Sequence, residues 1–62
     1  MTALELYVKE QKQHYKRMCK AYNYKPETFA PAEKALDRIM ELWRIGLLCY
    51  AEAIHAATEV RA

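Results

Sequence analysis

The sequence predicts an all-α fold in which an antiparallel two-helix hairpin assembles into a homo-oligomeric helical bundle. Two segments show helical spacing of apolar residues, and a short stretch containing Asn23 and Pro26 separates them. The second segment is apolar on more than one side, so its helix needs more than one neighbour. At 62 residues the chain is of a size at which a single core is marginal and oligomerisation commonly adds stability.

The composition indicates one domain spanning residues 1–62. Apolar residues make up 53% of the chain, with one glycine and two prolines, which is typical neither of a disordered nor of a β-rich protein. The net charge of +2 is unevenly distributed, because residues 1–25 carry six basic and two acidic side chains. An anionic partner would therefore meet the first helix.

The first helix is expected at about residues 3–22. Thr2 and Glu5 form a capping-box pattern, which places the start of the helix at Ala3. The following turn, at about residues 23–28, is predicted from Asn23, which tolerates the left-handed conformation, and from Pro26, which excludes its predecessor from a helix.

The second helix is expected to run without interruption from about residue 29 to residue 60. It would be about ten residues longer than the first helix, and its far end would project unless another subunit covered it. Gly46 in mid-helix lowers helix stability by about 1 kcal/mol relative to alanine. A close contact with another helix, which a glycine permits, would account for its presence. The residues expected at the oligomer interface are Leu42, Ile45, Gly46, Cys49 and Ala53.

The two cysteines, Cys19 and Cys49, are predicted to be free thiols. In the hairpin they would lie roughly 20 Å apart at about 1.5 Å per helical residue, whereas bridged Cα atoms lie within about 7 Å. Free thiols, and the lack of a basic and apolar leader, favour a cytoplasmic location. The longest apolar run, Ile45 to Ala51, is too short to cross a bilayer, so no membrane partner is expected.

A cluster of basic and aromatic residues at the end of the first helix is the predicted ligand-binding site. Aromatic faces next to cations suit bases and phosphates. The predicted ligand residues are Arg17, Lys20, Tyr22, Tyr24 and Lys25. Two structural interpretations compete with this one: the lysines at positions 12, 16 and 20 form a solvated helix face, and the aromatic rings close the end of the hairpin core.

No pattern in the sequence predicts catalysis, a metal site or a cofactor. His14 and His55 lack other ligands at metal-binding spacing, and the chain has no glycine-rich phosphate loop. We therefore expect a protein that is not an enzyme.

The stretch Tyr22-Asn-Tyr-Lys-Pro26, followed by a helix with Lys34 and Arg38 and an alanine-rich final segment, resembles the small helical phage proteins that sequester cyclic-nucleotide immune signals, the anti-CBASS sponges. The resemblance covers roughly residues 22–60. It implies an anti-defence binding protein that holds a nucleotide-like ligand, with Tyr24 and Lys25 as the matching pocket residues. In architecture the chain also resembles the Rop-type dimeric hairpin, a four-helix bundle that binds RNA.

Two classes of function follow from these observations. The first is a non-catalytic homo-oligomer that sequesters a phosphate-bearing small molecule between its subunits. The second is a protein-interaction module, an inhibitor or adaptor whose basic first helix docks an acidic protein partner. Nucleic-acid binding through the same basic face is a weaker alternative, because the net charge is low.

Overall fold

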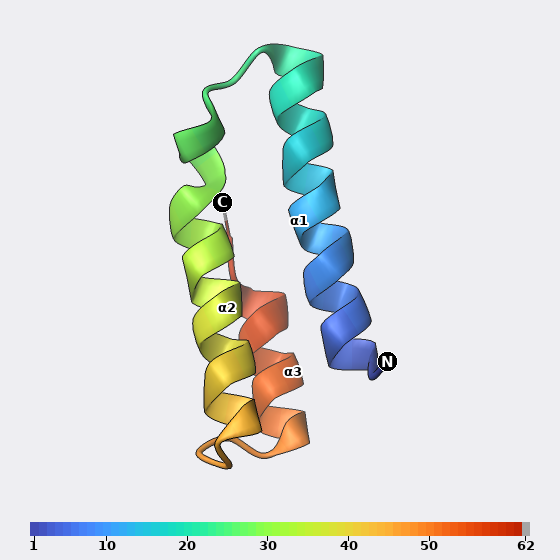
Figure 1. The fold of residues 1–62 in the computed structure, drawn as a ribbon, viewed down its shortest axis with the longest axis vertical. Coiled ribbons are helices and arrows are strands. Elements are labelled where there is room, and N and C mark those ends of the chain that lie inside the picture. Colours follow the sequence, from blue (N-terminus) through green and yellow to red (C-terminus); the bar gives the residue numbers. More distant parts are fainter. Residues whose placement is uncertain (62) are drawn as a thin grey trace.

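The fold is all-α, as the sequence predicts. The computed structural model describes residues 1–61, and this part of the chain forms α1 (Ala3–Tyr22), the short 3-10 helix η1 (Pro26–Phe29), α2 (Ala30–Arg44) and α3 (Tyr50–Glu59). Figure 1 shows α1 antiparallel to α2, with α3 turning back beside the lower half of α2. α3 contacts both other α-helices, so the lower end has three helices and the upper end has two.

Helix α1 has the predicted bounds, and the predicted capping residues define both of its ends. The Thr2 hydroxyl accepts the Glu5 amide at 3.2 Å, and the Glu5 carboxylate accepts the Thr2 amide at 3.3 Å. At the other end Asn23 adopts the left-handed conformation, with φ of 57°, and the Tyr24 amide donates to the Cys19 carbonyl at 3.1 Å. Pro26 then begins η1, which leads directly into α2.

The prediction of one continuous helix over residues 29–60 is wrong, because the chain reverses direction at Gly46. Gly46 has a φ of +82°, and its amide donates to the Trp43 carbonyl at 3.1 Å. The Leu47 amide donates to the Leu42 carbonyl at 2.9 Å, which completes the Schellman arrangement that ends a helix with a left-handed glycine. Gly46 is therefore the residue that stops α2, and it does not lie in a helix.

The reversal at Gly46 removes the main reason for predicting an oligomer, which was a second helix that projects beyond the first. Ala53 and Ala57, on α3, are 0% and 1% exposed, because they pack into the core of the same chain. Their small side chains suit the close approach of α3 to its neighbours. The end of the chain thus covers the apolar face of α2 itself, so no overhanging helix needs a second subunit.

The core is built from buried residues of all four elements. It contains Leu4, Val8, Tyr15, Phe29, Ala32, Leu36, Met40, Ala53 and Ala57. The Tyr50 hydroxyl accepts the Leu4 amide at 3.2 Å, so the start of α3 supplies a partner to an amide that the first turn of α1 leaves free. Within residues 1–61, no helix is both long and apolar enough to cross a membrane.

Candidate functional site

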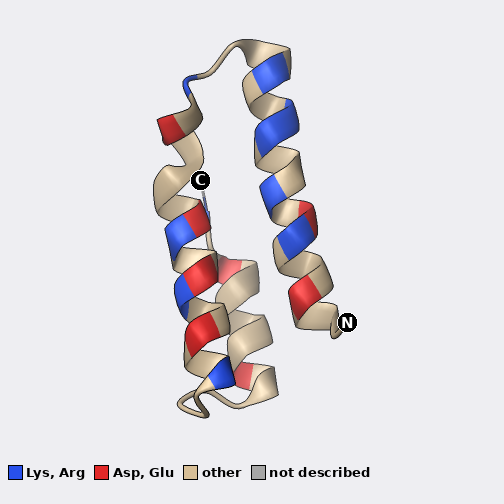
Figure 2. Cartoon of the chain, in the orientation of Figure 1, with Lys and Arg blue, Asp and Glu red and all other residues tan. Residues whose placement is uncertain are grey.

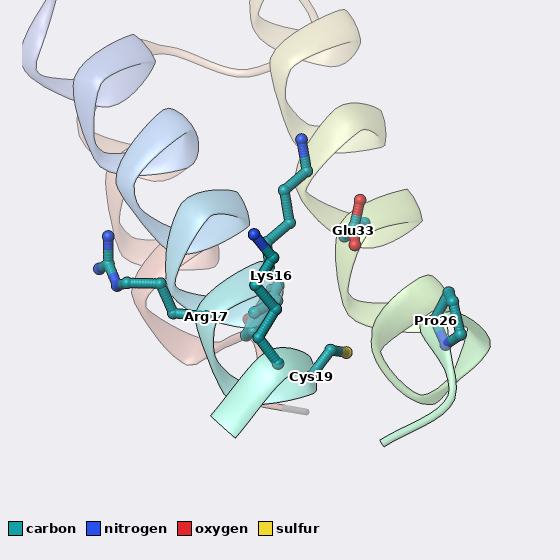
Figure 3. A pocket seen from close by; sticks show the side chains of 7 residues that line it. Lys16, Arg17, Cys19, Pro26 and Glu33 are labelled. Atoms are coloured by element: carbon teal, nitrogen blue, oxygen red, sulfur yellow. The ribbon is translucent and has the colours of Figure 1, made fainter. Parts of the chain in front are cut away.

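The upper part of the molecule contains a cleft of about 400 Å³ between the second half of α1 and the start of the α2 segment. Its lining residues come from three elements: Tyr15, Lys16, Arg17, Cys19 and Lys20 from α1, Pro26 from η1 and Glu33 from α2. We call this the upper cleft. Figure 3 shows Cys19 and Lys16 on the side of α1 that faces Glu33 and Pro26.

The floor and the upper end of this cleft follow from local packing. The Tyr15 ring is 5% exposed and stacks on Phe29, with ring centroids 4.8 Å apart. This stacking holds η1 against α1 and sets the distance between the two walls. The Cys19 thiol lies 3.8 Å from the Lys25 carbonyl oxygen, a contact that also joins α1 to the turn.

Two lysines give the upper cleft its positive charge. Lys16 and Lys20 form no ion pair with any residue in the range 1–61. The Arg17 guanidinium points away from Glu33, so only the stem of this side chain belongs to the cleft wall (Figure 3). The carboxylate of Glu33 is the one acidic group among the lining residues, so the cleft carries a net positive charge.

The third lysine of the α1 row has a structural partner. Lys12 forms an ion pair with Asp37 across the α1–α2 junction. This pairing relieves part of the repulsion between lysines four residues apart. The solvated-face interpretation of the lysine row is thus incomplete, because one of its members joins α1 to α2.

The pKa of the Tyr15 hydroxyl is raised, first by burial and then by the nearby Tyr7 and Glu33. Burial and a neighbouring negative charge both favour the neutral form of a phenol. The hydroxyl, which is protonated at neutral pH even at the ordinary pKa of about 10, is thus still harder to ionise. Among residues 1–61, no group of three His, Cys, Asp or Glu side chains is placed to hold a metal ion.

The predicted ligand residues divide into two groups in the structure. Arg17 and Lys20 line the upper cleft. Tyr22 and Tyr24 instead stack on each other above it, with ring centroids 5.6 Å apart and exposed fractions of 63% and 45%. Lys25 is exposed in the turn and does not belong to the cleft lining.

Five lining residues were absent from the predicted site: Tyr15, Lys16, Cys19, Pro26 and Glu33. Lys16 was part of the lysine row, and its spacing of four residues from Lys20 already placed the two on one face of α1. Pro26 and Glu33 could not be found in this way, because their positions depend on how η1 and α2 pack against α1.

A second hollow, the lower cleft, lies between the first half of α1 and the end of α2. Its volume is about 450 Å³. Its lining residues are Met1, Glu5, Val8, Lys9, Lys12, Gln13, Lys16, Met40 and Arg44. Lys16 lines both clefts, so the two hollows meet at this side chain.

The residues predicted for the oligomer interface have different environments. Ala53 belongs to the chain's own core, and Gly46 lies in the loop between α2 and α3. Leu42 is half-buried, Cys49 is exposed immediately before α3, and Ile45 is 58% exposed. Only the exposed loop residues of this set could meet another chain without disrupting the fold.

No protein-family model, curated protein or solved structure matches this chain. The geometry and charge of the two clefts are therefore the features that indicate a function.

Proposed function

We propose that this protein is a non-catalytic binding protein that holds a small nucleotide-like anion in the upper cleft. The observation that carries the proposal is a pair of lysines, Lys16 and Lys20, that have no ion-pair partner within residues 1–61 and stand beside a mainly apolar cleft of about 400 Å³. Ligand sites of about 300–1,000 Å³ that combine apolar walls with a few polar groups are typical of proteins. A flat ring would contact Cys19 and Pro26, and a phosphate would meet the lysines.

Sequestration, rather than turnover, fits the groups that line this cleft. None of them pairs a nucleophile with a positioned general base, and the one carboxylate among the lining residues, Glu33, lies across from Lys16 (Figure 3). A bound anion would relieve the repulsion between Lys16 and Lys20. The resemblance to phage proteins that sequester immune signals agrees with this role, and a cytoplasmic ligand would agree with the free thiols.

Calorimetry with mononucleotides, cyclic dinucleotides and ADP-ribose derivatives tests the proposal. A charge-assisted hydrogen bond contributes about 1.5–3 kcal/mol, so Lys20→Gln should weaken binding about tenfold to a hundredfold. Arg38→Gln is the matched control, because Arg38 is exposed on α2 and lines neither cleft. Tyr24→Ala should have a smaller effect than Lys20→Gln, since Tyr24 is not among the lining residues.

The proposal is wrong if no compound binds below about 100 μM, the affinity range in which a few charge-assisted contacts should suffice. It is also wrong if Lys20→Gln binds as tightly as Arg38→Gln. Capture of an acidic protein through the basic face of α1 would then be the better description of the function.

Self-association through the loop between α2 and α3 is a second part of this proposal. Ile45 and Leu47 are 58% and 70% exposed, and neither contributes to the core. Light scattering over a range of concentrations should show a dimer or larger assembly that Leu47→Ser weakens, whereas a constant mass of 7.3 kDa would exclude self-association.

A further inference from the structure

We propose that the ligand is a short single-stranded oligonucleotide that lies along α1 from the upper cleft into the lower cleft. This inference rests on the proposed function, because it names the class of ligand that the upper cleft binds. The starting observation is that Lys16 lines both clefts. A ligand bound at Lys16 and Lys20 can therefore extend into the lower cleft without leaving the protein surface.

The two clefts together form a strongly basic surface. Six basic side chains line them, against the two carboxylates of Glu5 and Glu33. Figure 2 shows this predominance of basic residues along α1, facing a mixture of acidic and basic residues on α2. Lys12 is paired with Asp37, and the Glu5 carboxylate accepts hydrogen bonds from Thr2.

The remaining cations extend beyond the reach of one mononucleotide. Of the five other lining cations, Arg17 points away from Glu33, and Lys9, Lys16, Lys20 and Arg44 form no ion pair within residues 1–61. Eleven residues separate Lys9 from Lys20, which is about 16 Å along a helix at about 1.5 Å per residue. Phosphates of one stacked strand lie about 3.4 Å apart along its axis, so this row spans about four or five phosphates.

Two exposed aromatic residues outside the upper cleft, Tyr22 and Tyr24, lie at one end of this row of cations. Tyr22 and Tyr24 follow Lys20 in the chain and stack on each other, yet remain 63% and 45% exposed. Single strands are bound by combining a basic groove along the backbone with aromatic rings on which bases stack. A base that leaves the upper cleft would meet the Tyr22 and Tyr24 rings, which gives this exposed pair a role.

Fluorescence anisotropy with labelled oligothymidylates of about two, six and ten nucleotides tests the inference, since single-strand sites span about 4–16 nucleotides. Affinity should rise at least about tenfold from two to six nucleotides and then level off. The slope of log affinity against log salt should be near −2.8 for four cations, at about −0.7 per phosphate neutralised on a single strand. A duplex of the same length should compete less well, because its bases cannot stack on the tyrosines.

The double variant Lys9→Gln/Arg44→Gln separates the two clefts. This variant should bind the six-nucleotide strand about as weakly as wild type binds the two-nucleotide strand. The slope of its log affinity against log salt should be smaller in magnitude by about 1.4. Its affinity for the two-nucleotide strand should equal that of wild type. Lys34→Gln/Arg38→Gln is the control, because it removes the same charge from the exposed face of α2. Circular dichroism verifies that both variants fold.

Each unfavourable result has a distinct meaning. If affinity does not depend on length, or if both double variants weaken binding equally, the extended site is wrong while the upper cleft still stands. If Lys20→Gln leaves every affinity unchanged, or if no compound of the small-nucleotide panel binds below about 100 μM, the proposed function fails together with the inference.

Discussion

Tyr15 of α1 and Phe29 of η1 stack almost parallel, at an interplanar angle of 7°, and this contact closes the upper end of the two-helix layer. Phe29 is 7% exposed, and Tyr24 meets it edge-on at a centroid distance of 6.1 Å. The pair therefore connects the turn, the core and the upper cleft.

Phe29→Ala is expected to destabilise the protein by about 3–5 kcal/mol, the usual cost of removing a buried ring. The loss would be large for a domain of this size. Urea unfolding followed by circular dichroism measures it, with Tyr22→Ala as the control, since Tyr22 is 63% exposed. Equal effects of the two substitutions would contradict the stacked arrangement.

Gly46→Ala is expected to lower stability by about 1–2 kcal/mol, because an L side chain is disfavoured in the left-handed conformation. A Cβ atom would meet nothing within 4 Å, so the cost arises from the φ of +82° and not from a clash. An uninterrupted helix would give the opposite sign, since Gly→Ala in a helix stabilises by about 1 kcal/mol. Gly46→Asn should cost less than Gly46→Ala, and all three proteins can be compared by their urea midpoints.

Stability should fall at acid pH, in part through Glu5. Hydrogen bonds from the Thr2 hydroxyl and amide lower the pKa of this carboxyl below its ordinary range. A lowered pKa in the folded state contributes stability above the unfolded value of about 4.3, which is lost as the pH falls through the folded value. Glu5→Gln should flatten the acid limb of a thermal melting series relative to wild type, and an identical acid limb would contradict this contribution.

Both cysteines should react as free thiols, with Cys49 faster than Cys19. Cys49 is exposed just before α3, whereas Cys19 is half-buried in the upper cleft near the opposite end of the molecule. Time-resolved thiol labelling should give two thiols per chain in two phases. A ligand in the upper cleft should slow the Cys19 phase alone, so slowing of both phases would argue against binding there.

The sequence was sufficient to predict α1 but not the second half of the chain. Thr2, Glu5 and Asn23 are local signals whose effect does not depend on tertiary contacts, so the bounds of α1 could be derived from them. The segment from Leu42 to Cys49 lacks proline and charged residues after Arg44, and its apolar spacing continues that of α2. Gly46 was the available signal for a helix end, and the turn at this residue lets Ala53 pack into the core.

Two of the five predicted ligand residues, Arg17 and Lys20, line the upper cleft, and the other three do not. Arg17 and Lys20 could be identified because charge and spacing along one helix are visible in the sequence. The opposite wall, Pro26 and Glu33, depends on how the turn and η1 orient α2. The exposure of Tyr22 and Tyr24 likewise depends on tertiary packing, in which Phe29 is the ring that stacks on Tyr15.

The reversal at Gly46 also has a consequence for the speed of folding. It brings α3 back onto α2 through a connection of only a few residues, so these two helices meet without closing a long loop. Helical chains dominated by such local contacts fold in about microseconds to milliseconds. The single tryptophan, Trp43, lies 5.7 Å from the Tyr50 ring across this connection, which places a fluorescent reporter at the junction expected to form first.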